Sequence, residues 1–259
     1  MSGPNCDKSI MPLDRMATLI SQFKDIDFPK SEYFVIGGGE AMAPYIFGDN
    51  AYMRRALSMI YNANGIPTIK TNAMWGNNKS LRHFILKDLA DTAYTHQIVT
   101  TLDISVDEFH KNTTGVTNII SDIIDSKYLA PAIRIFLVGF NTDASKLQLN
   151  KLQYNLKHNG IYTYSDSNKN YDFSAMKNDY GMRIFTSFET PIYMTGRAIE
   201  TKTYTTGPNT GLPDSDGHCF TVDNYDMATL NYKYRERIAG RDLNTVTKIL
   251  MNQLYHWEH

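Results

Sequence analysis

Three consecutive glycines followed by an acid, at positions 37–40, form the stretch of this sequence best suited to binding chemistry. The apolar residues before them, 34–36, predict a short β-strand. Glycines at the end of a strand let backbone amides approach a ligand closely, because no Cβ intervenes. Gly37, Gly38 and Gly39 would form this turn, and Glu40 would present its carboxylate at the tip of the strand. The alternative is a tight strand-to-helix turn in which Glu40 only caps the next helix.

Polar side chains also end four later apolar stretches that we expect to be strands. These stretches cover residues 66–72, 97–103, 132–140 and 161–164, and their ends carry Thr71 and Asn72, Asp103, Asn141 and Tyr164. Open α/β sheets and α/β barrels bind their ligands at the carboxyl ends of the strands. The repeated polar ends therefore predict a binding site at that edge.

Helices are predicted between these strands, because apolar residues recur there at helical spacing. The expected helices cover 9–25, 52–64, a segment capped by Ser80, a segment around 116–123, and a segment around 149–156 that ends at Asn159-Gly160. Gly65 is the expected residue after the second helix. Alternation of strand and helix at a spacing of about thirty residues indicates parallel βα units. Beyond Ser165 we expect a further strand at 182–188, a long loop at 201–217 and a closing helix capped by Asp242.

Composition narrows the classes of function. With 26 basic and 27 acidic residues the net charge is −1, so nucleic acid is not an expected partner. The apolar runs are too short to cross a bilayer and the first residues lack a signal-peptide pattern, so we expect a cytoplasmic protein without a membrane partner. The two cysteines, Cys6 and Cys219, cannot form a disulfide scaffold or a complete cysteine metal site.

The order of these landmarks resembles the radical S-adenosylmethionine (radical SAM) superfamily over roughly residues 10–198. Three strand ends resemble the family's Gly-Gly-Glu-Pro motif, its Thr-Asn-Gly motif, and its Ser-x-Asp pattern with a later His: Gly38-Gly39-Glu40-Ala41, Thr71-Asn72-Ala73, and Thr101-Leu102-Asp103 with His110. Three later segments are similar to the family's second half and its peptide-modifying members: 133–140 with Asn141, Asn159-Gly160-Ile161, and Gly196-Arg197-Ala198.

The resemblance implies a fold, a cofactor and a set of contacts. The fold would be a partial (β/α) barrel of parallel strands over residues 1–198, with the first strand missing, and an irregular C-terminal extension with a closing helix over 199–259. The cofactor would be S-adenosylmethionine, with its ammonium held by Glu40 and its methionine part lined by the 37–39 backbone. Candidates for contacts to the ribose, the carboxylate or a substrate are Thr71, Asn72, Asp103 and Asn141.

One family feature is missing from this sequence. Radical SAM proteins bind a [4Fe–4S] cluster through Cys-x3-Cys-x2-Cys, and no such motif occurs here. The sequence therefore resembles a family member that lacks its cluster segment. Three explanations are open: a truncated gene product, a degenerate relative, or a partner protein that supplies the missing strand. Radical chemistry on a peptide or small molecule would require a cluster supplied from outside this chain. The alternatives are a non-catalytic relative that binds S-adenosylmethionine or a partner protein, and an unrelated βα-barrel enzyme using Glu40 or Asp103.

Two smaller groups of residues could also bind a metal. Asp103, Asp107, Glu108 and His110 cluster near the end of an expected strand, although the last three are also explained by a solvated loop. His218 and Cys219 lie near Asp214 and Asp216, where a surface loop is the simpler explanation.

Overall fold

Helices and strands alternate along the part of the chain that the computed structural model describes. That part comprises residues 10–23, 33–37, 40–110, 112–165, 173–177, 180–189, 220–222, 227–230, 234–237, 241–242, 245–246, 248–250 and 252. The helices are α1 (Leu13–Phe23), α2 (Ala43–Ile46), α3 (Asn50–Asn62), the 3₁₀ helix η1 (Met74–Asn77), α4 (Lys79–His96), α5 (Thr113–Ile124) and α6 (Asp143–His158). The strands are β1 (Tyr33–Ile36), β2 (Ile66–Thr71), β3 (Thr100–Ser105), β4 (Ile133–Phe140), β5 (Tyr162–Ser165), β6 (Phe173–Lys177), β7 (Tyr180–Glu189), β8 (Phe220–Val222), β9 (Met227–Leu230) and β10 (Tyr234–Arg237).

Seven of these strands form one open sheet in the order β1-β2-β3-β4-β7-β6-β5. The pairs from β1 to β4, and the pair β4–β7, are parallel, whereas β6 is antiparallel to both of its neighbours. The predicted α/β class and the parallel βα units are confirmed. The position of β5 differs from a simple βα succession, because the β6–β7 hairpin separates β5 from β4. Strands β8, β9 and β10 form a separate antiparallel sheet.

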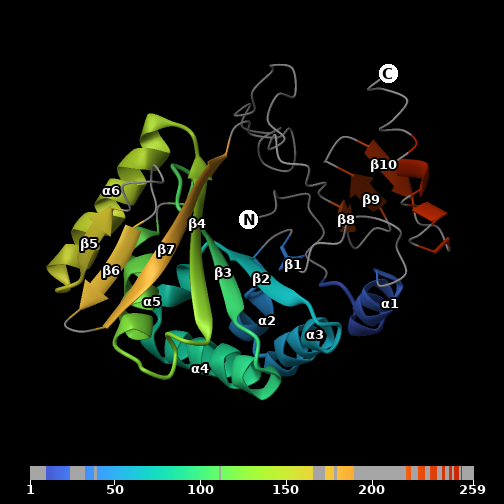
Figure 1. Ribbon diagram of the computed structural model, residues 1–259, viewed down its shortest axis with the longest axis horizontal. Coiled ribbons are helices and arrows are strands. Elements are labelled where there is room, and N and C mark those ends of the chain that lie inside the picture. The colour runs from blue at the N-terminus through green and yellow to red at the C-terminus, as the bar shows by residue number, and fades with distance from the viewer. Residues whose placement is uncertain are drawn as a thin grey trace.

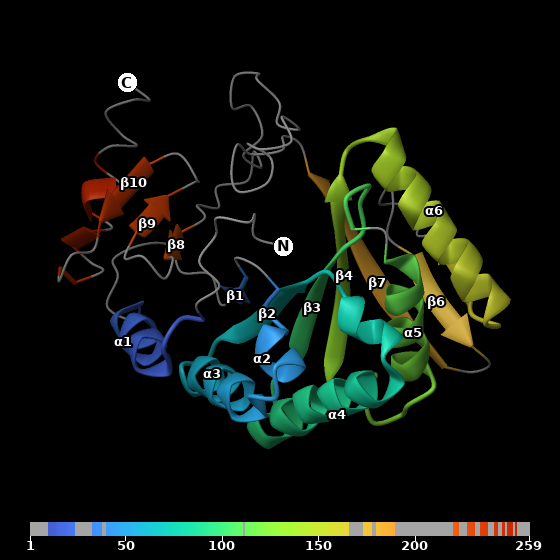
Figure 2. The same ribbon diagram turned by 180° about the vertical axis from the view of Figure 1, so that it is seen from behind.

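The helices α2 to α6 lie along one side of the large sheet (Figures 1 and 2). Strand β4 shows why, because its residues alternate between buried and partly exposed. Ile133, Ile135 and Leu137 are buried on the helix side, and Arg134 and Phe136 point to the opposite side. Alternation of this kind is expected when only one face of a strand packs against helices.

Helix ends follow the predicted pattern with two corrections. The side chain of Asn78, not Ser80, caps α4 by accepting a hydrogen bond from Leu81 N at 3.1 Å. Asn64, not Gly65, is the left-handed residue after α3, with φ of 58°. The backbone N–H groups of Asn64 and Gly65 donate to the carbonyls of Tyr61 and Ile60, which closes the helix in a Schellman motif. At the end of α6, Gly160 has φ of 72°, as expected.

A buried carboxylate fixes helix α2, which begins just after Glu40. Asp88 of α4 is 3% exposed and accepts hydrogen bonds from the Tyr45 hydroxyl at 2.6 Å and from Arg54 Nε of α3. Burial, and then the hydrogen bond to Asp88, raise the pKa of Tyr45. The contact therefore joins three helices through one satisfied buried charge.

Four of the remaining sequence predictions concern the C-terminal region. Asp242 accepts a hydrogen bond from Thr245 N at 2.8 Å, so it caps the helical residues that follow, as predicted. The segments 196–198, 201–217 and 218–219 lie outside the described residues.

Within the described part of the chain, no helix combines the length and the apolar character needed to cross a membrane.

The backbone of η1 lies against the first turn of α5. A Cβ added to Gly115 would lie 2.5 Å from the carbonyl oxygen of Ala73, and a Cβ on Gly76 would collide with the Gly115 carbonyl. Ala73 itself has φ of 56°, in the left-handed region. This close approach places the loop after β2 directly beside the start of α5.

We predict that Gly115→Ala lowers the free energy of unfolding by about 3 kcal/mol, because the new methyl meets backbone that cannot rotate away. Gly160→Ala is the control, because a Cβ at this position would have open space around it. Its free energy of unfolding should fall by only about 1 kcal/mol, the cost of placing alanine at a left-handed φ. Denaturant unfolding of both variants measures the difference. An equal loss in the two variants would contradict the close contact.

Candidate functional site

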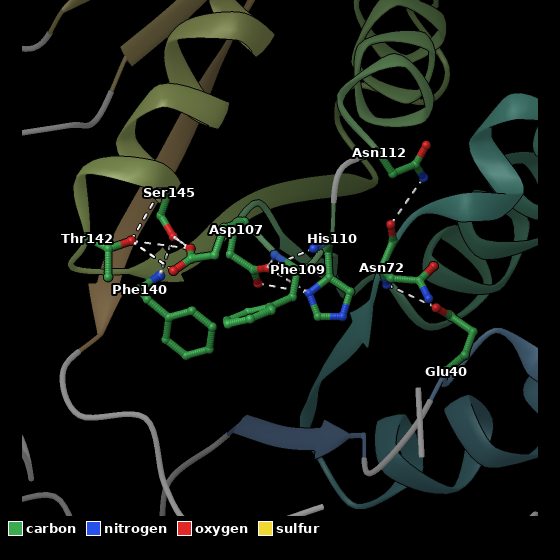
Figure 3. A network of polar contacts seen from close by, with 10 residues as sticks. Glu40, Asn72, Asp107, Phe109, His110, Asn112, Phe140, Thr142 and Ser145 are labelled. Carbon is green, nitrogen blue, oxygen red and sulfur yellow. Dashed lines mark hydrogen bonds and ion pairs between the residues drawn. The ribbon is translucent and has the colours of Figure 1, made fainter. Parts of the chain in front are cut away.

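The carboxyl ends of β1, β2, β3 and β4 meet at one edge of the sheet, because these strands are parallel. Figure 3 shows polar side chains from the following loops arranged along this edge, from Glu40 at one end to Ser145 at the other. The edge is the candidate functional site.

Glu40 connects the end of β1 to the end of β2. Its carboxylate accepts hydrogen bonds from Met42 N at 3.0 Å, from the Thr71 hydroxyl at 2.7 Å and from Asn72 N at 3.0 Å. The Met42 contact lies in the turn before α2, whose N-cap residue is Met42 and which has no side-chain cap, so Glu40 closes this turn without capping the helix. The other two contacts reach a second strand, so Glu40 does more than close a local turn.

The Thr71 hydroxyl organises the loop after β2. This side chain is 2% exposed, donates to Glu40, and accepts hydrogen bonds from Ala73 N and Trp75 Nε1, both at 3.0 Å. Asn72 Oδ1 accepts from Met74 N at 2.9 Å in the same turn. All of these polar groups are satisfied inside the loop, which keeps the backbone of residues 71–75 in one conformation.

Asn112 ties this loop to α5. Its side-chain Nδ2 donates to the Asn72 carbonyl at 3.2 Å, and its Oδ1 accepts from Asn77 Nδ2 at 2.9 Å. Asn112 occupies the N-cap position of α5 but makes no capping hydrogen bond with its side chain. The amide bridges β2, η1 and α5 instead.

The loop after β3 carries two carboxylates, Asp107 and Glu108, with different hydrogen-bond partners. Asp107 Oδ1 accepts hydrogen bonds from the backbone N–H groups of Phe109 and His110, both at 2.8 Å. His110 Nδ1 lies 2.9 Å from Asp107 Oδ2 and 3.0 Å from Oδ1. Glu108 accepts from the hydroxyls of Thr142, at 3.1 Å, and Ser145 at the start of α6.

These contacts correct the interpretation of 107–110 as a solvated loop. Asp107 is 3% exposed, and Glu108 is held against α6. The metal-site alternative gains no support either: within the described residues, no group of three or more His, Cys, Asp or Glu side chains could hold a metal ion.

The predicted site residues separate into two groups. Glu40, Thr71 and Asn72 come together at the edge. Asp103 does not lie at a strand end, because β3 continues to Ser105; it faces the side of the sheet opposite the helices, with Lys70 Nζ at 3.8 Å. Asn141 is exposed beside α6 and, within the described part of the chain, makes no hydrogen bond to Glu40 or its partners.

The glycine turn is only partly described. A Cβ on Gly37 would meet Lys70 at 3.5 Å, an ordinary contact, so packing does not require glycine there. Gly38 and Gly39 lie outside the described residues.

Sequence reasoning did not place Asn112 in the site and did not pair Asp107 with His110. The three-residue spacing of Asp107 and His110 was the available signal for the pair. Asn112 gave no signal, since its partners, Asn72 and Asn77, lie at least 35 positions away in the sequence.

No protein-family model matches this chain, and no curated protein is significantly similar to it.

We predict that Thr71→Val lowers the free energy of unfolding by about 3 kcal/mol, because it leaves Ala73 N and Trp75 Nε1 without their buried acceptor. Thr71→Ser keeps the hydroxyl and should lose about 1 kcal/mol, for the missing methyl. Denaturant unfolding, followed by fluorescence that includes Trp75, separates the two. Equal losses would show that the hydroxyl does not organise the loop.

Proposed function

We propose that this chain binds S-adenosylmethionine at the carboxyl edge of β1–β4, as a radical SAM-like protein built on a partial (β/α) barrel. The observation that carries the proposal is the position of Glu40. Its carboxylate lies beyond the end of the parallel strand β1 and is held by Thr71 and Asn72. These two residues belong to the segment that resembles the family's Thr-Asn-Gly motif.

The arrangement of layers supports a partial barrel. Doubly wound sheets carry helices on both faces, whereas a (β/α) barrel keeps its helices outside and its strands facing inward. Here α2 to α6 share one side of the sheet (Figure 2), and Lys70, Asp103 and Phe136 point to the other. In this proposal those three side chains line the inner face.

The Glu40 carboxylate has capacity to accept one more hydrogen bond, from a ligand. A carboxylate offers about four lone-pair sites. Three are used by Met42 N, the Thr71 hydroxyl and Asn72 N; of the two oxygens, Oε2 accepts only Asn72 N among the described residues. One further donor, such as the ammonium of an amino acid, would complete the set with a charge-assisted hydrogen bond.

The residues of this chain do not fit an iron–sulfur cluster. A [4Fe–4S] cluster of this family needs three closely spaced thiolates, and the sequence holds two cysteines separated by more than two hundred positions. We therefore propose ligand binding, and not a radical reaction, as the function of this chain on its own. Modification of a peptide or small molecule would need a cluster segment from outside it.

We predict that Glu40→Gln weakens S-adenosylmethionine binding at least about tenfold, because a charge-assisted hydrogen bond is lost. Isothermal titration calorimetry measures the affinity. Asp91→Asn, on the exposed side of α4, is the matched control and should leave the affinity unchanged.

A second ligand, methylthioadenosine, distinguishes the loss of the Glu40 contact from a general disturbance of the loop. Methylthioadenosine lacks the amino-acid part, so its affinity should not depend on Glu40. Equal weakening for both ligands would point to a disturbed loop, and no binding of S-adenosylmethionine to the native chain would refute the proposal.

A further inference from the structure

His110 projects from the loop after β3 into the same edge as Glu40. The backbone carbonyl of His110 accepts a hydrogen bond from Asn112 N at 2.8 Å. Asn112 Nδ2 in turn donates to the backbone carbonyl of Asn72, and the backbone N–H of Asn72 donates to Glu40. Figure 3 shows the imidazole between Asp107 and Asn72. The backbone of His110 is thus linked to the Glu40 contact through two residues, Asn112 and Asn72.

Asp107 determines which nitrogen of the ring carries the proton. An ionised carboxylate can only accept, so the Nδ1 atom that lies 2.9 Å from Asp107 Oδ2 must be protonated. In the neutral ring the other nitrogen, Nε2, is then an acceptor. Asp107 is itself held by the backbone N–H groups of Phe109 and His110, so it cannot turn away easily.

The imidazole is not needed to close this turn. The two backbone N–H groups already bind the Asp107 carboxylate, and any residue except proline at position 110 could supply the second of them. The ring nevertheless stays accessible, with 28% of the side chain exposed, and it lies beside Phe109, a residue that is 49% exposed. An oriented and accessible imidazole next to an apolar ring is a binding feature more than a structural one.

We propose that His110 Nε2 accepts a hydrogen bond from a hydroxyl or ammonium group of the ligand, and that Asp107 is the positioning residue that fixes this tautomer. The proposal rests on the proposed function for its ligand, S-adenosylmethionine, which carries both kinds of donor. Glu40 and His110 would then present two acceptors on opposite sides of Asn72.

The first experiment reads the tautomer directly in the free protein. Long-range proton–nitrogen correlation spectra of ¹⁵N-labelled chain distinguish the two neutral forms, and His110→Gln identifies the signal. We expect the Nδ1–H form in the native chain. Asp107→Asn places an NH₂ group where Oδ2 lay 2.9 Å from Nδ1. Oδ1, 3.0 Å from Nδ1, remains but already accepts from the backbone N–H groups of Phe109 and His110, so the ring should shift toward the Nε2–H form.

The second experiment measures S-adenosylmethionine binding by calorimetry. His110→Gln and Asp107→Asn should each weaken the affinity about tenfold, the effect of one hydrogen bond, and the double variant should lose no more than either alone. His83→Gln is the matched control, because His83 pairs with Asp122 at 3.1 Å between α4 and α5, away from the edge. It should bind like the native chain.

The outcomes separate the two proposals. Binding that depends on Glu40 but not on His110 overturns this inference and leaves the proposed function standing. An Nε2–H form in the native chain also overturns it, whatever the ligand does. If the native chain does not bind S-adenosylmethionine, the proposed function fails, and the tautomer alone decides whether His110 is an oriented acceptor.

Discussion

The carboxylate of Glu40 binds the ends of two parallel strands together, and the rest of the edge is arranged around this contact. Parallel strands pair through their backbones, but the loops that leave them have no such constraint. Glu40 supplies it by accepting from the turn into α2 and from both Thr71 and Asn72. With Thr71 fixed, Ala73 and Trp75 follow, and the close approach of η1 to α5 becomes possible.

This arrangement uses most of the site's polar atoms for its own structure. The Thr71 hydroxyl has one proton and accepts twice, so it has little capacity for a ligand. Both polar atoms of the Asn112 amide are likewise engaged by neighbouring residues. Rigid loops of this kind lower the entropy cost of binding, because few side chains remain to be ordered when a ligand arrives.

Local patterns predicted the elements well and their arrangement less well. The strand at 133–140 and the helix around 116–123 follow from apolar spacing that each segment carries alone. The insertion of β6 and β7 between β4 and β5 depends on pairings between distant segments, which spacing does not encode. The predicted caps were wrong for a different reason, because apolar spacing does not fix the exact residue at which a helix begins or ends. Asn78 caps α4 two residues before Ser80, and Asn64 is the left-handed residue one position before Gly65.

The same limit explains the candidate site. Thr71 ends β2, Asn72 follows it, and Glu40 lies four residues beyond the end of the adjacent β1, so parallel pairing brings the three residues near one another. Glu108 is predicted to be a solvated loop residue because its partner Thr142 lies 34 positions away, which local spacing does not encode. The partners of Asp107 are local, at positions 109 and 110, but its burial is not visible in the local sequence. The carboxylate of Glu108 accepts hydrogen bonds from the hydroxyls of Thr142 and Ser145 at the start of α6. The carboxylate of Asp107 orients His110 and leaves that ring accessible. In the proposed complex, Glu40 Oε2 and His110 Nε2 are therefore the acceptors that would bind the hydrogen-bond donors of the ligand.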